Sequence, residues 1–297
     1  MMRYTWPTRF LDFILFSNLF IACCAMAQGA LTYLLLETQP NLIVIALLGC
    51  STIFLYNFSM ILARPKNPLN SPHRRVHWIY SHYKLVVTLT SLSAIALIPL
   101  ILQLSFKTIF LLGMTGLLAI SYSFPLFKGA SNRFGLRNLP GAKLFIISMV
   151  WALSCVCVPI MELKSSGTTV SLFGLLILAS KRFLFITAIT IPFDIRDLFQ
   201  DKQYNLKTLP VILGERKANL FCQSLLLLYI LLLLLFVNQL SLATIGLILV
   251  TLLTGWLIFK SRWEKNEYYY FLFLDGTLIL QFLSVFVLQY FSNSIHF

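Results

Sequence analysis

Charged residues are scarce in this chain, and acidic residues are the scarcest of them. Only 11% of its 297 residues are charged, whereas about a quarter are charged in a typical soluble domain. Ten residues are Asp or Glu, and only Asp12, Glu37 and Glu162 precede position 194. With 59% apolar residues, the chain has more apolar surface than a water-soluble core could bury. Lipid must therefore be its main solvent.

The chain also lacks cysteine pairs with metal-site spacing and any arrangement typical of nucleophilic catalysis. All six cysteines lie inside apolar runs, at Cys23, Cys24, Cys50, Cys155, Cys157 and Cys222. We interpret them as small core residues, neither disulfides nor metal ligands. No Ser–His–Asp or Cys–His set stands out in the polar loops, so we assign no catalytic residue.

Nine apolar runs make up most of the sequence, and each has about the ~20 residues that a helix needs to cross a bilayer. They are Leu11–Leu36, Asn41–Ala63, Leu85–Phe106, Thr108–Phe127, Ala142–Met161, Val170–Phe193, Ala218–Val237, Leu240–Phe259 and Tyr268–Phe291. The sequence predicts an all-α membrane protein of about nine transmembrane helices in a single domain, 1–297. The first run is longer than the core of a signal peptide, so we expect an uncleaved first helix.

Basic residues gather on one side of the predicted bundle. The net charge is +13. The N-terminus and the segments after helices 2, 4, 6 and 8 hold 19 Lys and Arg, whereas the segments after helices 1, 3, 5 and 7 hold only Lys107 and Lys164. The positive-inside rule places the basic segments in the cytoplasm. We expect a multi-pass protein of a bacterial inner membrane, with its basic loops on anionic lipid and no nucleic-acid partner.

Lys181 and Arg182 fall inside the sixth apolar run. If the sixth helix begins near Val170, both cations lie at mid-depth, which is energetically expensive. Alternatively, 170–180 lies along the outer surface and the span begins near Arg182. The sequence leaves both readings open.

A cluster of carboxylates follows the sixth run, at Asp194, Asp197 and Asp201. On a helix, positions i, i+3 and i+7 share one face, so the three anions repel each other and favour a counter-ion. Carboxylate oxygens suit magnesium, which commonly bridges protein carboxylates to substrate phosphates. We predict magnesium ligands here. The alternative is a solvated helix end in which Asp197 pairs with Arg196 or Lys202.

The spacing Asp194-x-x-Asp197-x-x-x-Asp201, followed by Lys207-Thr-Leu-Pro-Val-x-Leu-Gly, resembles the second aspartate-rich motif of the UbiA family of intramembrane prenyltransferases. In detail, this motif is similar to that of the subgroup that makes menaquinone-type lipids, and Tyr122-Ser-x-Pro adds to the likeness. The resemblance implies a nine-helix bundle around a central cavity. It also implies transfer of a polyprenyl group from its diphosphate, with aspartate-bound magnesium and with Tyr122 lining the cavity.

The first aspartate motif of that family is missing. The family pattern is Asn-Asp-x-x-Asp-x-x-x-Asp, and the matching stretch here begins at Asn57 but has Phe58, Ile61 and Pro65 where the aspartates should be. Arg64 lies seven residues after Asn57 and would share its helical face. A guanidinium can bind phosphate directly. We therefore expect one magnesium, with the far phosphate held by Asn57 and Arg64, and with Lys207 also facing the diphosphate.

Two further features are less specific. The stretch 72–80 holds His73, Trp78 and Tyr80 among arginines, and we favour an interfacial helix there over a histidine metal site. Asp275 lies within the ninth run, where an acid either contacts a polar group of a neighbouring helix or lines the cavity.

These features predict a membrane prenyltransferase that uses magnesium, a prenyl diphosphate and an aromatic or other lipid acceptor. Cations would stabilise the diphosphate as the allylic C–O bond breaks. The alternatives are an inactive relative that binds or moves prenyl lipids, favoured by the missing motif, and a small-molecule transporter, for which only Lys181 and Arg182 speak.

Overall fold

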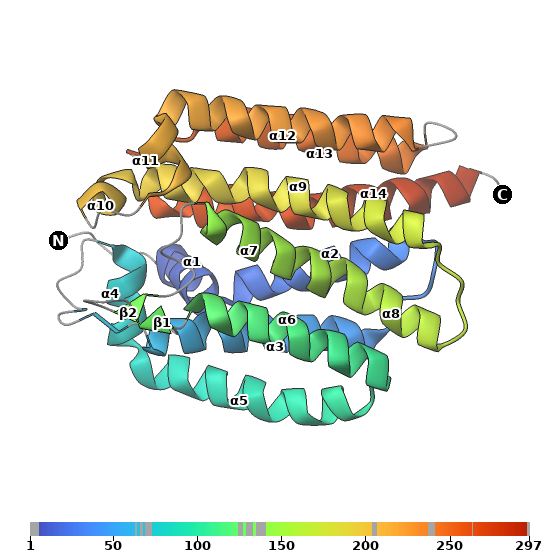
Figure 1. The fold of residues 1–297 in the computed structure, drawn as a ribbon, viewed down its shortest axis with the longest axis horizontal. Helices are drawn as coiled ribbons and strands as arrows, with labels where there is room; N and C mark the ends of the chain where they lie inside the picture. Colours follow the sequence, from blue (N-terminus) through green and yellow to red (C-terminus); the bar gives the residue numbers. More distant parts are fainter. Residues whose placement is uncertain are drawn as a thin grey trace.

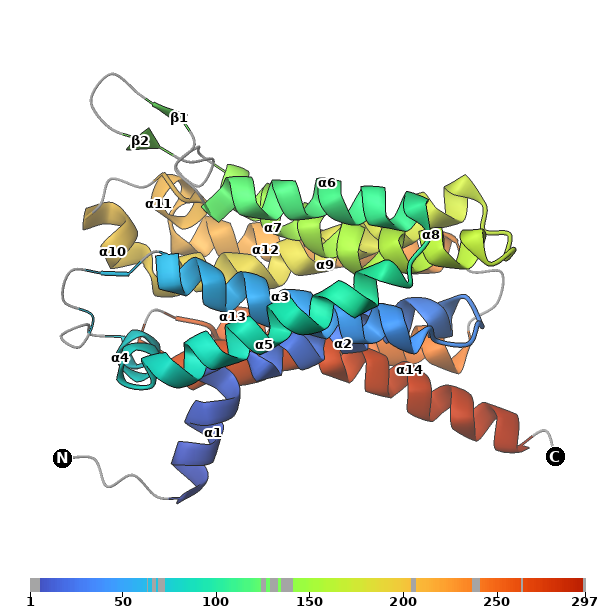
Figure 2. The same cartoon turned by 90° about the horizontal axis from the view of Figure 1, so that it is seen from below.

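The chain forms a bundle of long, roughly parallel helices, seen from two directions in Figures 1 and 2. The computed structural model describes residues 6–62, 64–65, 68, 73–123, 127–128, 133–134, 141–203, 207–236, 241–262 and 264–295. In lipid every backbone polar group needs a partner within the chain, and the α-helix supplies one locally. The apolar runs therefore fold as helices.

The helices follow the predicted runs closely. The long ones are α2 (Leu19–Leu35), α3 (Leu42–Leu62), α5 (Tyr83–Leu102), α6 (Phe106–Ser123), α9 (Leu172–Arg196), α12 (Glu215–Leu235), α13 (Leu242–Lys260) and α14 (Asp275–Ile295). The fifth span joins α7 (Ala142–Ala152) to α8 (Val158–Ser165) through a π-helical stretch at Leu153–Cys157. A second π-helical stretch, Tyr269–Leu274, leads into α14.

Within the described ranges, seven helices are long and apolar enough to cross a membrane, and α6 is a shorter apolar helix. The pair formed by α1 (Trp6–Phe16) and α2 is a further candidate span, broken by a bend of 60°. The prediction of an all-helical membrane bundle with about nine helices is therefore confirmed. The continuous first helix, Leu11–Leu36, was wrong, because the chain breaks at Asn18, whose backbone is left-handed (φ 67°).

Short elements cluster at one end of the bundle, which we call the basic end. They are α4 (Arg74–Ser81), the paired strands β1 (Phe127–Lys128) and β2 (Arg133–Phe134), α10 (Leu198–Gln203) and α11 (Leu209–Leu213). Both views place them together at the end opposite the α2–α3 and α8–α9 connections (Figures 1 and 2). The expected helix in the stretch 72–80 is present as Arg74–Ser81, and its place at a membrane interface stays a prediction.

The core lies where α2, α7, α9, α12, α13 and α14 meet, around Cys24, Phe185, Ile191, Tyr270 and Leu274. Outward faces carry large apolar side chains in contact with the surroundings, such as Ile95 on α5 and Leu249 on α13, both about 60% exposed. An apolar exterior over a tightly packed interior is the pattern of a protein whose solvent is lipid.

The structure decides between the two alternative placements of Lys181 and Arg182. Helix α9 is continuous from Leu172, so both cations lie within the span. Arg182 is buried, and its guanidinium donates to the Gln28 carbonyl of α2 (3.1 Å) and lies 3.5 Å from the Thr32 hydroxyl. Contacts to a carbonyl and a hydroxyl of α2 make the buried charge tolerable.

Candidate functional site

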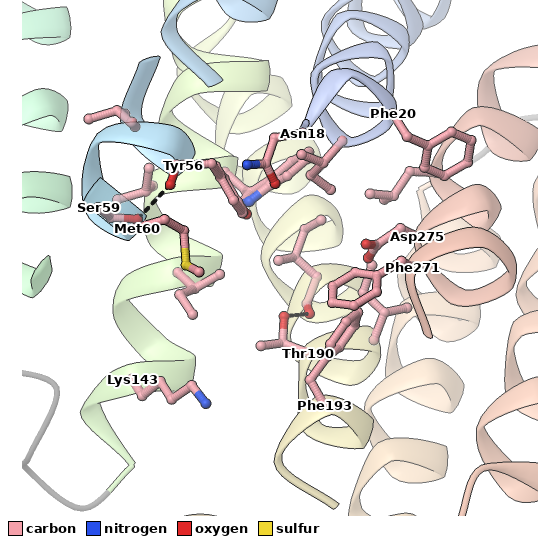
Figure 3. Close-up of a pocket in the computed structure, with 18 of the residues that line it drawn as sticks. Asn18, Phe20, Tyr56, Ser59, Met60, Lys143, Thr190, Phe193, Phe271 and Asp275 are labelled. Atoms are coloured by element: carbon pink, nitrogen blue, oxygen red, sulfur yellow. Dashed lines mark hydrogen bonds between the residues drawn. The ribbon is translucent and has the colours of Figure 1, made fainter. Parts of the chain in front are cut away.

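A cavity of about 350 Å³ opens between α2, α3, α7, α9 and the start of α14 (Figure 3). Its walls are mainly apolar, with Ile147 and Trp151 from α7 and Ile189 from α9 among them. In Figure 3, Tyr56 and Met60 of α3 lie across the open space from Phe271 and Asp275. An apolar chamber with a few polar groups is the usual form of a small-molecule site.

Most of the charged side chains in the lining come from helix ends at the basic end, whereas Asn18, Ser59 and Thr190 add neutral polar groups. Arg75 lies in the first turn of α4, Lys143 in the first turn of α7, and Arg196 and Asp197 where α9 ends. In Figure 3 the Lys143 side chain points into the open space. The cavity therefore combines a largely apolar interior with a mouth of three cations and Asp197, and a second carboxylate, Asp275, lies on its wall.

The predicted metal ligand Asp194 is 1% exposed and forms an ion pair with Lys143. Asp197, the C-cap of α9, accepts two hydrogen bonds from Arg196, at 2.8 and 3.0 Å. Burial alone would raise the pKa of Asp197, but the Arg196 guanidinium holds it below its usual value. Two of the three aspartates are thus already neutralised by side chains of the chain itself.

Asp201 lies in α10, one turn beyond Asp197, and is buried. Its Oδ2 atom is buried without a hydrogen-bond partner. Burial raises the pKa of Asp201, Lys143 lowers it, and the carboxylates of Asp194 and Asp197 raise it again. The three aspartates are therefore electrostatic neighbours, as their spacing predicted.

A magnesium ion does not fit this arrangement without rearrangement. No three Asp, Glu, His or Cys side chains converge as metal ligands in the part of the chain that is described. The unpaired Asp201 oxygen could accept a cation, but the oxygens of Asp197 are bonded to Arg196 and one oxygen of Asp194 is bonded to Lys143. The cations occupy positions around the carboxylates that a metal would need.

Asn57, the remnant of the missing first motif, is fully buried. Its amide oxygen accepts a hydrogen bond from the Asn18 amide (2.7 Å), and its amide nitrogen donates to the Ser17 carbonyl (3.3 Å). The Asn18 oxygen in turn accepts from the Arg75 guanidinium (2.7 Å). Asn57 thus fixes the break between α1 and α2 and, through it, a cation at the cavity mouth.

Helix α4 is held over the mouth by two carboxylates that the sequence analysis did not use. Glu267 accepts hydrogen bonds from the backbone amides of Arg74 and Arg75, at 2.9 and 3.0 Å, as an acid does at a helix N-terminus. Asp12 pairs with the Arg74 side chain at 2.6 Å. The only signal in the sequence is that Asp12 is a lone acid in an apolar run; Glu267 follows Glu264 by three residues and gives no signal of its role.

Other predicted site residues lie at varying distances from the cavity. Asp275 is on its wall. Arg64 is exposed and is absent from the cavity lining; its guanidinium stacks over the rings of Tyr80 and Tyr83, at 5.8 and 5.6 Å. Lys207 is exposed just before α11. The Tyr122 side chain lies outside the described part of the chain.

Comparison with solved structures identifies the fold. A UbiA homolog from Archaeoglobus fulgidus bound to GPP and Mg²⁺ aligns with a TM-score of 0.67 at 12% identity, covering 93% of this chain and 99% of that one. The same homolog bound to DMAPP and Mg²⁺ gives 0.65, also at 12% identity, covering 93% and 98%. The apo UbiA homolog from Aeropyrum pernix K1 gives 0.62 at 13% identity, covering 92% and 96%.

Comparison at the level of sequence points to the same family. No curated protein sequence matches the chain. The sequence model of the UbiA prenyltransferase family matches residues 79–276. That stretch includes the aspartates at the end of α9 and in α10, and it begins beyond Asn57. It covers about two thirds of the chain, and we conclude that this protein belongs to the UbiA prenyltransferase family.

Proposed function

We propose that this protein binds a prenyl diphosphate and transfers its prenyl group to an aromatic or other lipid acceptor. The observation that carries the proposal is the cavity itself, which is apolar within and lined at its mouth by Arg75, Lys143 and Arg196. A prenyl diphosphate has the same two-part character, with an apolar tail and an anionic head. The Archaeoglobus fulgidus UbiA homolog of the same fold is bound to GPP in one structure and to DMAPP in another.

The tail would lie between α3, α7 and α9, where Ile147, Trp151 and Ile189 exclude water. The cavity volume of about 350 Å³ is near the lower end of the roughly 300–1,000 Å³ typical of small-molecule sites. A short prenyl chain is therefore the better fit. A longer chain would have to extend between helices into the lipid.

The head group would sit at the mouth, where the guanidinium and ammonium groups offer charge-assisted hydrogen bonds. In the transfer, the allylic C–O bond breaks and the diphosphate leaves with the electron pair. The prenyl carbon then bonds to the acceptor, which releases a proton. Fixed cations stabilise the charge that develops on the leaving oxygen, and the apolar walls keep water from the allylic cation.

Magnesium at Asp194, Asp197 and Asp201 remains the prediction of the sequence motif, and the Archaeoglobus fulgidus homolog of the same fold is bound to Mg²⁺ in two structures. As the side chains lie, a metal would have to displace Lys143 and Arg196. We therefore derive no step of the transfer through a metal. A membrane location with the basic end in the cytoplasm, and a role in quinone-type lipid synthesis, belong to the same proposal.

The proposal is tested with full-length protein in lipid nanodiscs and labelled geranyl diphosphate. We expect saturable binding, and transfer of label to lipid when a membrane extract supplies acceptors. Ile147→Trp fills the cavity and should abolish binding, whereas the matched Leu249→Trp, on a lipid-facing surface, should not. Binding without transfer would favour the inactive prenyl-lipid binder. Equal binding in both variants would place the ligand elsewhere.

A further inference from the structure

We infer that Arg75 is the cation that binds the substrate head group in place of the missing first aspartate motif, with Asn18 and Asn57 as its positioning residues. The inference rests on the proposed function, because it assigns the head-group contact of the same cavity. It differs from the sequence-based expectation, which gave this role to Arg64 and to the Asn57 amide.

Arg75 has the capacity to bind an added anion. It lines the cavity, and its Nε atom is buried without a hydrogen-bond partner. Lys143, Arg196 and the adjacent Arg74 each pair with a carboxylate, whereas no carboxylate pairs with the Arg75 side chain among the residues that the structure describes. Glu267 and Asp275 act on the Arg75 guanidinium only from beyond ion-pair distance. The buried Nε–H group is therefore still without a partner, which is costly, and a diphosphate oxygen would satisfy it.

The position of Arg75 is fixed before any ligand arrives. The Asn18 amide nitrogen is used by Asn57, so the Asn18 oxygen is the atom that faces the guanidinium. The guanidinium also lies over the Phe271 ring, 4.8 Å from its centroid. Glu267 holds the Arg75 backbone amide. A side chain held by two contacts on an anchored backbone loses little conformational freedom on binding, which favours affinity.

The neighbouring charge on α9 supports an anion between the two helices. Burial lowers the pKa of the Arg75 guanidinium, the positive charge of Arg196 lowers it further, and the carboxylates of Glu267 and Asp275 offset these effects only in part. Both guanidinium groups line the same cavity. Two like charges at one mouth repel, and an anion placed between them would convert this repulsion into two attractions.

The loss of the first motif then has a structural counterpart. Two-motif relatives, by the resemblance, place aspartates after helix 2, and those aspartates attract metal cations to a diphosphate. In this protein the second predicted span is α3, and it keeps only Asn57 of the motif. Asn57 holds Arg75 through Asn18. The cation belongs to the protein itself, so this half of the head-group site needs no aspartate.

The test compares two ligands in full-length protein: geranyl diphosphate, and geraniol, which has the same tail without the charge. Arg75→Gln should weaken geranyl diphosphate binding by about 10- to 100-fold, the loss of a charge-assisted hydrogen bond, and leave geraniol binding unchanged. The matched control Arg216→Gln removes the same charge at the same end, from an exposed side chain in the first turn of α12 that lies outside the cavity lining, and should change either affinity less than about twofold.

The positioning role is tested with Asn18→Gly, which keeps the left-handed backbone and removes the amide. It should weaken diphosphate binding by roughly three- to tenfold on its own and have no further effect in the Arg75→Gln background. A purely structural role would instead give additive losses. This variant also serves if Arg75→Gln fails to fold, because its selective loss of diphosphate affinity would still report on Arg75.

The outcomes distinguish a failure of the inference about Arg75 from a failure of the proposed prenyl-transfer function. If wild-type protein binds geranyl diphosphate and Arg75→Gln binds it equally well, the inference is overturned and the proposed function stands. If Arg75→Gln loses both ligands in parallel, Arg75 is structural and the inference is again overturned. If the wild-type protein binds neither ligand, the proposed function itself fails.

Discussion

The ion pair between Lys143 and Asp194 gives the sharpest test of how the site is built. The Asp194 side chain is 1% exposed and that of Lys143 is 20% exposed, so solvent screens the pair little. Removing one partner of such a pair leaves a buried charge without compensation, which typically costs about 3–5 kcal/mol. We therefore expect Asp194→Asn and Lys143→Met each to lower the unfolding midpoint by an amount of the order of 10 °C.

The double variant separates the pair from its surroundings. With both charges removed, neither partner is left uncompensated, so the double variant should be more stable than Asp194→Asn alone. The coupling energy should fall within the roughly 0.5–3 kcal/mol measured for residues in contact. The assay is thermal unfolding of detergent-solubilised protein, followed by size-exclusion chromatography. Additive losses in the double variant would refute a direct Lys143–Asp194 interaction.

The same pair predicts how the protein responds to metal. Lys143 competes for the carboxylate that a divalent ion would need. Lys143→Met should therefore raise the affinity for Mn²⁺, measured by isothermal titration calorimetry, above that of the wild type. Asp194→Asn should lower it. A wild-type protein that binds metal tightly and is indifferent to Lys143→Met would mean that the aspartates coordinate metal away from this pair.

Three further predictions concern topology, packing and pH. A cysteine in place of Lys202 should react with an impermeant maleimide only from the cytoplasmic side, and labelling from outside would overturn the predicted orientation. Gly29→Ala would drive a methyl group into the α2–α3 contact and should destabilise by about 1–3 kcal/mol in thermal unfolding, whereas Gly113→Ala on the open face of α6 should not. The ion pair with Glu267, 3.6 Å from His73 Nδ1, raises the pKa of His73. Its stabilising contribution is therefore present at low pH and is lost as pH rises through that raised pKa. The unfolding midpoint should fall above about pH 6.5 in the wild type and change less in Glu267→Gln.

The helices were predictable because each depends only on the composition of its own stretch of sequence. A run of about 20 apolar residues has one stable form in lipid, whatever its neighbours. The break at Asn18 was not predictable in the same way. A 60° bend needs only one residue with a left-handed backbone, and asparagine inside an apolar run is compatible with an unbroken helix.

Only those parts of the site whose residues lie close together in the sequence could be predicted. The aspartates on α9 and α10 are close because one chain segment carries them. Their partner Lys143 lies 51 residues earlier, so only the folded bundle brings it to Asp194. The expectation for Arg64 assumed that α3 continues to it, but α3 ends at Leu62, so the shared helical face is lost. Arg75 takes the place at the cavity because α4 folds back over it.

The buried Arg182 has a consequence for how the chain is made. On its own, α9 would bring Lys181 and Arg182 into the bilayer, at a cost of roughly 2.5–3.5 kcal/mol for each charge at the centre of a helix. The groups that accept the Arg182 guanidinium, Gln28 and Thr32, belong to α2. Because α2 is synthesised long before α9, these acceptors are already in the membrane when α9 emerges from the ribosome. The order of helices along the chain thus allows the sixth span to insert beside its partner.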